Sequence, residues 1–428
     1  KCCARTSRMH SFEYRHGELC CEQVPVSQIA KEVGTPCYIY SHATLTRHFR
    51  AYDSAFKTIP HLVAFAMKAN SNLAILRLMA KEGSGVDIVS GGELFRALKA
   101  GVPASKIVFA GVGKNQDEIR DALKADILMF NVESSAELRA INEVGAMVGR
   151  KARVALRINP DIDPKTHPYI STGLKKSKFG IAADRALEEY QLASSLPWID
   201  VVGVHAHIGS QLTDVTPFIE ALKKVVKLLE SLKGQGIHIR YLNMGGGLGI
   251  TYSDEKPPLP QDLADAISPL VKNLDLTLVM EPGRVIVGNA GILVTKALYQ
   301  KEGEAKRFVI VDAAMNDLIR PSLYSAYHDI RPVSEAVLHR SKRAVDVVGP
   351  VCESGDFLAK DRTLPEVQPG DLLAVMSAGA YGFVMASNYN SRPRVPEVLV
   401  KNSEVHVIRR RETYDDLVRG ETIPEFLA

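Results

Sequence analysis

Short apolar runs of strand length recur along most of the chain. Eight of them follow one another, at 62–67, 85–89, 106–110, 126–131, 152–158, 201–207, 239–244 and 276–281. Segments with helical periodicity separate most of these runs, namely Leu73 to Lys81, Gly92 to Ala100, Gln116 to Lys124, Ser135 to Val144 and Pro217 to Lys233. Strands that alternate with helices form βαβ units and a parallel sheet. Eight such units in about 225 residues predict an α/β fold with a closed (β/α)8 TIM-like barrel, and an open doubly wound sheet is the alternative.

The pattern changes after Gly291, where helical periodicity fades. Short β-rich runs replace it, at 292–299, 307–311, 343–348, 371–376 and 404–409. These runs predict a second, all-β domain at the C-terminal end of the chain. The expected domains are therefore a barrel over residues 41–290 and a β domain over residues 291–428.

The first 40 residues have no place in the count of barrel strands. Residues 12–24 contain a His16-Gly17 turn and predict a hairpin. A short helix over Val26 to Val33 and a strand over Cys37 to Tyr40 follow, and Ser41 is expected to cap a helix that runs to about Thr58. We expect residues 1–40 to form a segment that joins the β domain.

Composition and charge narrow the classes of function. The 428 residues carry 53 basic and 49 acidic side chains, and no run of five or more like charges occurs. Nucleic acid is therefore not expected as a partner. No apolar run reaches the ~18 residues of a membrane helix, so no membrane partner is expected. The six cysteines show no CxxC spacing, so no metal site is expected. Free thiols and the absence of a signal-peptide pattern favour an intracellular protein. The bacterial cytoplasm is the expected compartment, with the plastid stroma as the alternative.

Chemically active side chains follow the predicted strands. In a barrel of this kind, reactive groups gather at the carboxyl ends of the strands. The candidates at those ends are Lys68, Asp87, Glu93, Arg157, His205, His207, Ser210, the glycine run 245–249, Glu281 and Arg284. If the strand count is right, these residues converge on one rim of the barrel.

Lys68 ends the first apolar run. Desolvation at the tip of a buried strand favours the neutral amine, which is the form that attacks a carbonyl group. The alternative is a lysine whose stem is buried while its ammonium group reaches water.

Three further candidates have a structural alternative as well. The run Gly245-Gly246-Gly247-Leu248-Gly249 could hold a phosphate on its backbone N–H groups, or be a tight turn. His207 could face a ligand ring, or be an ordinary core histidine. Glu281 could serve a buried site, or form a surface ion pair with Arg284. A lysine, a phosphate cradle, a flat imidazole and a carboxylate together imply a phosphorylated aromatic aldehyde, and pyridoxal 5'-phosphate fits each part.

Seven stretches carry a resemblance to a known family. They are Phe65 to Asn70, Val86 to Glu93, His207 to Gln211, Gly245 to Gly249, Glu281 to Arg284, Val351 to Asp356 and Gly379 to Gly382. In this order they resemble the fold-type III pyridoxal-phosphate-dependent decarboxylases, which share the alanine racemase fold. The resemblance implies a barrel with a C-terminal β domain, in agreement with the pattern of strands and helices.

The resemblance also implies a role for each matching residue. Lys68 would be the Schiff-base lysine, and His207 would stack on the cofactor. The phosphate would be bound by Ser210, Gly246, Gly247, Gly283, Arg284 and Tyr381. Glu281 would face the pyridine nitrogen, with Asp87, Glu93 and Arg157 as supporting residues. Substrate would be bound by Arg284, Arg320, Tyr324, Glu353 and Tyr381. Cys352 would return a proton to the substrate, and Cys352 and Glu353 would come from the partner subunit of a homodimer.

The reaction that the resemblance implies is the decarboxylation of meso-2,6-diaminopimelate to L-lysine and CO2, the last step of lysine biosynthesis. Two arginines could hold the distal carboxylate, which ornithine lacks. Ornithine decarboxylases carry Cys-Asp where this chain has Cys352-Glu353. The alternatives are a decarboxylase acting on ornithine, arginine or carboxynorspermidine, a racemase, and a non-catalytic pyridoxal-phosphate-binding protein. An acid such as Glu281 at the ring nitrogen speaks against a racemase, because it makes the ring a strong electron sink.

Overall fold

The computed structural model describes residues 9–162 and 178–427. The first eight residues of the predicted segment 1–40 lie outside the described residues. The chain divides into two compact units. One unit comprises Thr46–Ile286, and the other comprises the two flanks, up to Leu45 and from Val287 onward. The chain crosses from one unit to the other within helix α3 (His42–Ala55) and again within helix α11 (Arg284–Val287).

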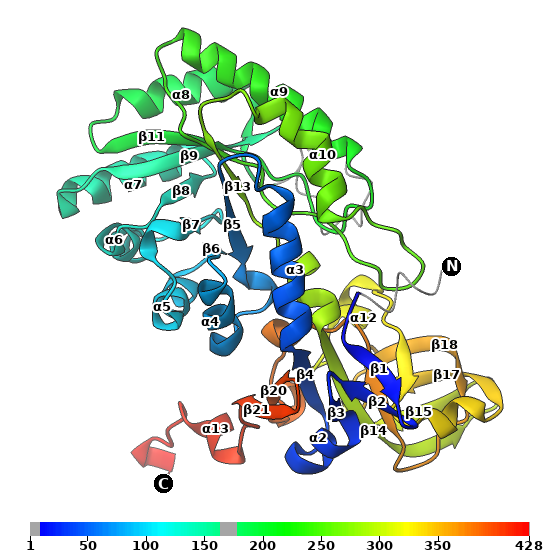
Figure 1. Cartoon of the computed structure of the whole chain (residues 1–428). Helices are drawn as coiled ribbons and strands as arrows, with labels where there is room; N and C mark the ends of the chain where they lie inside the picture. The colour runs from blue at the N-terminus through cyan, green and yellow to red at the C-terminus, as the bar shows by residue number, and fades with distance from the viewer. Residues whose placement is uncertain (1–8, 163–177, 428) are drawn as a thin grey trace. The chain divides into compact units, whose positions relative to one another are not determined.

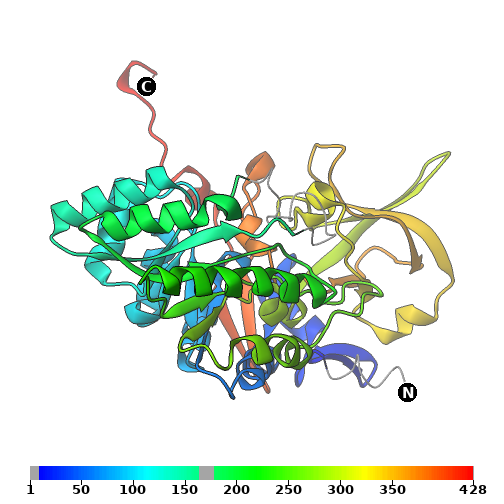
Figure 2. The same ribbon diagram turned by 90° about the horizontal axis from the view of Figure 1, so that it is seen from above.

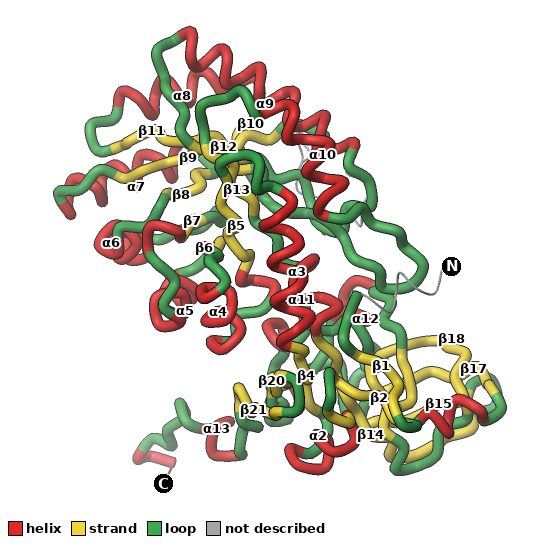
Figure 3. Tube along the Cα trace, in the orientation of Figure 1, coloured by secondary structure: helices red, strands yellow, loops and turns green. Residues whose placement is uncertain are grey.

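The first unit is built on a closed barrel of parallel strands (Figures 1 and 3). Within the described residues its eight strands are β5 (His61–Ala66), β6 (Gly85–Ile88), β7 (Ile107–Phe109), β8 (Met129–Val132), β9 (Ala152–Asn159), β11 (Ile199–His205), β12 (Tyr241–Asn243) and β13 (Thr277–Met280). Each pairs with the next in parallel, and β13 pairs with β5 to close the ring. A short strand, β10 (Ile181–Ala182), adds to β9. The predicted barrel is confirmed, and the open doubly wound sheet is wrong.

Helices follow the barrel strands, and the cyan and green helices flank the strands in Figure 2. They are α4 (Leu73–Lys81), α5 (Gly91–Ala100), α6 (Gln116–Ala125), α7 (Ser135–Val148), α8 (Ala186–Ser195), α9 (Thr216–Gly234) and α10 (Pro260–Val271). At several helix starts a polar side chain accepts a hydrogen bond from a free backbone N–H group, as the side chains of Asn72, Ser90 and Ser134 do. Asp126 ends α6 in a left-handed conformation, and for this reason β8 begins three residues later than the apolar run at 126–131 predicted.

The barrel interior is filled by small and medium apolar side chains. Its buried cluster contains Ala64, Val108, Leu128, Met129, Ala155, Val202 and Val279. Filling a barrel interior with side chains makes it a packed core and not a channel. The functional groups are therefore confined to the strand ends and the loops that follow.

The second unit is rich in antiparallel strands. Its main sheet has the order β18-β17-β15-β14-β4-β20-β21, and β19 pairs with both β14 and β16. The strands are β4 (Cys37–Ser41), β14 (Gly291–Glu302), β15 (Arg307–Val311), β16 (Ile330–Pro332), β17 (Lys342–Val348), β18 (Phe357–Pro365), β19 (Leu372–Val375), β20 (Glu397–Lys401) and β21 (Glu404–Arg409). The β-rich nature predicted for the region after Gly291 is confirmed.

The N-terminal residues contribute to this second unit. A small sheet joins β1 (Phe12–Arg15), β2 (Glu18–Cys21) and β3 (Val24–Pro25), and β4 pairs with β14 and β20. Ser41 accepts the N–H of Thr44 at the start of α3, as expected, but α3 ends at Ala55 and not near Thr58. The remaining α-helices in the described part of the chain are α2 (Val26–Val33), α12 (Arg320–Tyr324) and α13 (Tyr414–Val418).

Among the described residues, no helix combines the length and the apolar character needed to cross a membrane.

The start of β6 provides a test of barrel packing. A Cβ added at Gly85 would lie 2.2 Å from the carbonyl oxygen of Lys106, so the Gly85→Ala variant must move backbone. We expect it to lose roughly 1–3 kcal/mol of unfolding free energy, the usual cost of overpacking, measured by urea denaturation. Gly113→Ala is the control, since its Cβ meets nothing within 4 Å. Equal denaturation midpoints for the two variants would contradict this account of the packing.

Candidate active site

Lys68 and Asp87 form an ion pair at one end of the barrel. Lys68 lies in a single 3-10 turn, Met67–Ala69, directly after β5, and its Nζ lies 2.7 Å from Asp87 Oδ2 on the neighbouring strand β6. The Lys68 side chain is 36% exposed, whereas that of Asp87 is fully buried. Burial raises the pKa of Asp87 to about 6, and the charge of Glu281 adds to this rise while Lys68 opposes it. The lysine head is thus fixed by a carboxylate while it stays accessible.

Glu281 is a buried carboxylate that follows β13. Its Oε1 accepts hydrogen bonds from Asn131 Nδ2 at 3.0 Å and from Asn243 Nδ2 at 2.6 Å, and its Oε2 lies 3.7 Å from His205 Nε2. Burial by itself would raise the pKa of Glu281, but the neighbouring His205 and Lys68 outweigh it and hold the pKa well below its usual value. Glu281 is therefore an anion in a water-poor setting.

His207 lies two residues beyond the end of β11. Its Nδ1 accepts the backbone N–H of Gly246 at 3.2 Å, which requires an unprotonated Nδ1. Burial lowers the pKa of His207 well below its usual value, and the charges of Arg157 and Lys68 lower it further. The imidazole is thus neutral.

The glycine run after β12 packs its backbone directly against the backbone of neighbouring segments, with no side chain in between. A Cβ at Gly246 would lie 2.1 Å from the carbonyl oxygen of Glu281, and one at Gly247 would lie 2.7 Å from that of Gly209. Gly247 also has a φ of +126°, a conformation that favours glycine. The run is therefore required by close packing, and it leaves backbone without side chains where an anion could approach.

Arg284 and Ser210 are brought together at the same end of the barrel. Arg284 Nη2 donates to Ser210 Oγ at 3.0 Å, and Arg284 Nη1 donates to Tyr252 OH at 2.6 Å. Glu281 and Arg284 are only 4% and 6% exposed, so the surface ion pair considered for them is wrong. Gly283 lies between them, where a Cβ would contact Ala66 at 3.1 Å.

Glu93 lies in the first turn of α5, and Arg157 lies near the carboxyl end of β9. Glu93 Oε2 accepts the backbone N–H of Val89 at 2.7 Å, and burial raises the pKa of Glu93 to about 7. Arg157 Nη1 donates to Glu133 Oε1 at 2.9 Å, and its guanidinium group lies 4.6 Å from the centre of the Phe179 ring. The pair with Glu133 is buried and charge-neutral, which favours a supporting role for Arg157.

The other predicted site residues belong to the β-rich unit. Arg320 is buried at the start of α12, and Tyr324 ends that helix. Cys352 is exposed, and its backbone N–H donates to Asn390 Oδ1 at 2.8 Å. The remaining two are Glu353, which accepts from Tyr389 OH at 3.3 Å, and Tyr381, which has a φ of +54° in the segment after β19.

Four residues of the candidate site escaped the sequence reasoning. They are Asn131, Glu133, Asn243 and Tyr252, which contact Glu281, Arg157 or Arg284. Asn131 and Asn243 lie at or next to the carboxyl ends of β8 and β12. Lys68 and Glu281 were singled out as polar residues at the carboxyl ends of strands. The same rule could have found Asn131 and Asn243, because a fully buried amide in a barrel strand is unusual.

The donor set of the barrel fits pyridoxal phosphate. A lysine for the aldehyde, a buried anion for the ring nitrogen, a neutral imidazole for the ring face and a glycine-rich backbone for the phosphate are grouped at one end of the strands. Asp87 Oδ1 is also buried without a hydrogen-bond partner among the described residues, which marks a site prepared for a further polar group.

Comparisons with known proteins agree with this assignment. Residues 42–288 match the family described as pyridoxal-dependent decarboxylase, pyridoxal binding domain. The diaminopimelate decarboxylase of Aquifex aeolicus is 54% identical over 408 residues, covering 95% of this chain and 96% of the relative. The crystal structure of diaminopimelate decarboxylase from Helicobacter pylori complexed with L-lysine is 48% identical, with a TM-score of 0.88 over 92% of this chain and 98% of that chain.

A third comparison covers nearly the whole length. The diaminopimelate decarboxylase of M. jannaschii in complex with L-lysine is 44% identical, with a TM-score of 0.93 over 98% of this chain and 99% of that chain. The similarity therefore extends over both units and not over the barrel alone. On the site geometry and these matches, the chain belongs to the pyridoxal-dependent decarboxylases, and within them to the diaminopimelate decarboxylases.

Proposed function

We propose that this protein decarboxylates meso-2,6-diaminopimelate to L-lysine and CO2, the last step of lysine biosynthesis, with pyridoxal 5'-phosphate as cofactor. The observation that carries the proposal is the buried Glu281 anion at the same end of the barrel as the Lys68–Asp87 pair. The matched relatives are named diaminopimelate decarboxylase, and the match covers nearly their full length. Because the matched curated relatives include bacterial enzymes, we propose the bacterial cytoplasm as its place of action.

The barrel residues would hold the cofactor at three points. Lys68 would bond to its aldehyde carbon, Glu281 would accept the N–H of the ring nitrogen, and the glycines at 246 and 247 with Ser210 and Arg284 would bind the phosphate. When bound, pyridoxal phosphate supplies an electron sink for the bond that breaks at the substrate α-carbon. Gly283 and Tyr381 complete the proposed set of cofactor contacts.

Each barrel side chain then has a physical task. Glu281 is held as an anion, so it keeps a proton on the ring nitrogen. Asp87 fixes the Lys68 amine, with which it pairs at 2.7 Å, and its carboxylate could take the proton that the amine must lose before it bonds to the cofactor. The neutral His207 can cover one face of the ring and exclude water from it without adding a positive charge.

The β-rich unit would supply most of the substrate contacts. Arg320 and Tyr324, together with Arg284 and Tyr381, would bind the carboxylates, because guanidinium groups match carboxylates in two-pronged geometry. Glu353 would bind the distal ammonium group, and Cys352 would donate a proton to the α-carbon after CO2 has left. The distal carboxylate is what separates diaminopimelate from ornithine, which has a distal ammonium group but no second carboxylate.

We further propose a homodimer with shared sites, in which Cys352 and Glu353 of one subunit serve the barrel of the other. Cys352 is exposed in the single chain. A residue that acts in the site of the partner subunit has to be exposed in this way. Apolar side chains near the C-terminus are exposed as well, including Tyr414, Ile423 and Phe426 at 78%, 80% and 83%. Such a group of exposed apolar side chains is typical of a protein interface.

Replacing the lysine tests the central claim. We expect Lys68→Ala to release CO2 from meso-diaminopimelate at least roughly a thousandfold more slowly than wild type, because it removes the covalent anchor of the cofactor. Lys99→Ala, which changes a lysine on helix α5, should keep wild-type activity. A wild-type protein that decarboxylates ornithine faster than meso-diaminopimelate would overturn the substrate assignment.

Replacing the carboxylate tests the electron sink. Glu281→Gln keeps the size of the side chain but removes its negative charge, so we expect kcat to fall roughly 10²- to 10³-fold, the usual cost of losing one preorganised electrostatic contact. The KM for meso-diaminopimelate should change far less. Glu230→Gln on α9 is the exposed control. An unchanged kcat in Glu281→Gln would show that ring protonation does not depend on this residue.

Mixing two defective variants tests the shared site. If Cys352 acts in the partner's site, subunit exchange between Lys68→Ala and Cys352→Ala restores one intact site per mixed dimer. About a quarter of wild-type activity is then expected, since half of the dimers are mixed and each has one of two sites. Lys68→Ala mixed with Glu281→Gln is the control and should recover nothing, because both changes lie in the barrel.

A further inference from the structure

Two buried amides donate to a single oxygen of Glu281. Asn131 lies on β8 and Asn243 ends β12, and both side chains are 0% exposed. Their Nδ2 atoms lie 3.0 Å and 2.6 Å from Oε1. The amide oxygens cannot take these places, because they would repel the carboxylate. Two strands that are not adjacent in the barrel thus hold the same carboxylate oxygen.

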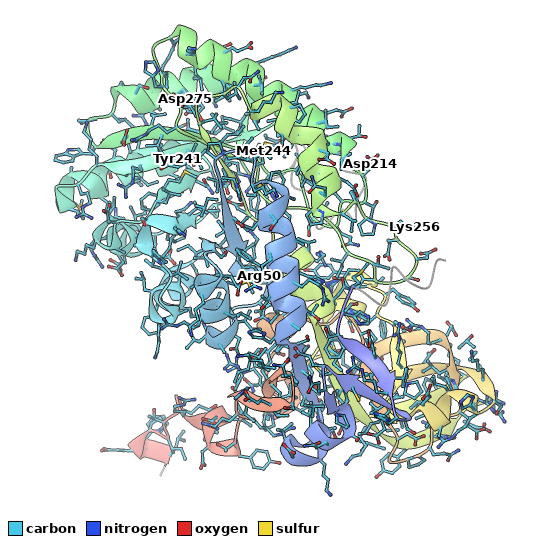
Figure 4. The ribbon with its side chains drawn as sticks, viewed as in Figure 1. Arg50, Asp214, Tyr241, Met244, Lys256 and Asp275 are labelled. Carbon is cyan, nitrogen blue, oxygen red and sulfur yellow. The ribbon has the colours of Figure 1, made fainter. Side chains whose placement is uncertain are left out.

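Asn243 makes a second contact, with the start of the glycine run. Its Oδ1 accepts the backbone N–H of Gly245 at 2.9 Å. Met244, which is labelled in Figure 4, is the one residue that separates Asn243 from Gly245 in the sequence. In return, the backbone N–H of Glu281 donates to the carbonyl oxygen of Gly245 at 2.7 Å. One amide side chain therefore connects the carboxylate with the backbone that is assigned to the phosphate.

We propose that Asn131 and Asn243 are positioning residues for the cofactor ring: together they fix Oε1 of Glu281 and leave Oε2, which lies 3.7 Å from His205 Nε2, as the oxygen that faces the ring nitrogen, and Asn243 also fixes the start of the glycine run. The proposal rests on the function proposed above. Asn131 then serves the ring-nitrogen end alone, whereas Asn243 serves both ends of the cofactor.

The chemistry of the amide group suits this task. The ionisable groups around Glu281 are already His205 on β11, Lys68 after β5 and Asp87 on β6, and the neutral His207 follows β11. A neutral amide adds a donor to this cluster without adding a charge or a proton that could be transferred. Hydrogen bonds from uncharged donors to a buried carboxylate are also among the stronger ones in proteins.

Binding measurements on the protein freed of cofactor can separate the effect of the ring-nitrogen contact on cofactor affinity from that of the phosphate contact. Affinities for pyridoxal phosphate and for its 1-deaza analogue, in which CH replaces the ring nitrogen, would be measured by fluorescence titration. Asn131→Leu should weaken pyridoxal phosphate binding roughly tenfold, the equivalent of one hydrogen bond to a charged group, and should not weaken binding of the analogue. Asn243→Leu should weaken both compounds, because it also loosens the phosphate backbone.

A matched control lies in the same unit. Asn142 on α7 accepts the backbone N–H of Trp198, so Asn142→Leu should leave both affinities unchanged. Where Asn243→Leu does not fold, Asn243→Asp decides the matter, because it keeps the size and the contact to Gly245 but places a second carboxylate against Glu281. It should weaken pyridoxal phosphate more than the analogue.

Two results would overturn the inference. One is wild-type affinity for pyridoxal phosphate in Asn131→Leu and in the informative Asn243 variant. The other is an equal loss for both compounds in Asn131→Leu, which would indicate a general structural defect. Failure of the wild-type protein to bind pyridoxal phosphate or to decarboxylate meso-diaminopimelate would instead overturn the proposed function.

Discussion

The candidate site depends on one buried negative charge. Glu281 is nearly inaccessible to water, and an isolated carboxylate in such a place would take up a proton. Two amide donors and the neighbouring His205 and Lys68 keep it ionised. Burial of the Glu281 charge costs free energy, but it also strengthens the electrostatic interactions of that charge, because the low dielectric of the site weakens screening. The ion pair of Lys68 with Asp87 extends this cluster of balanced charges.

The barrel makes such a cluster possible. Parallel strands present their carboxyl ends at one rim, so single residues from distant parts of the sequence meet there. Asn131, Asn243 and Glu281 come from three different strands or strand ends, yet they share one hydrogen-bonded group. The glycine run allows its backbone to approach Glu281 and Gly209 more closely than any side chain would permit. The rigid strands and the glycine backbone together therefore place charged groups within hydrogen-bonding distance of their partners.

The sequence pattern predicted the fold well because the relevant signals are local. A buried parallel strand requires an apolar run, and an outer helix requires a periodic apolar face, so both appear within a few residues. The errors fall at element ends. Asp126 adopts a left-handed conformation that ends α6, and β8 therefore starts later than its apolar run. In the same way His207 lies beyond β11, in the segment where its ring meets Gly246.

The sequence by itself determined the alternation of strands and helices, the glycine run and the chemical types at the strand ends, because each is specified by neighbouring residues. Only the tertiary structure decided which of these groups meet. It paired Lys68 with Asp87, decided between a buried and a surface position for Glu281, and revealed the two asparagines that hold it. Contacts between residues as far apart as 131 and 281 depend on closure of the barrel, and no local pattern encodes that closure.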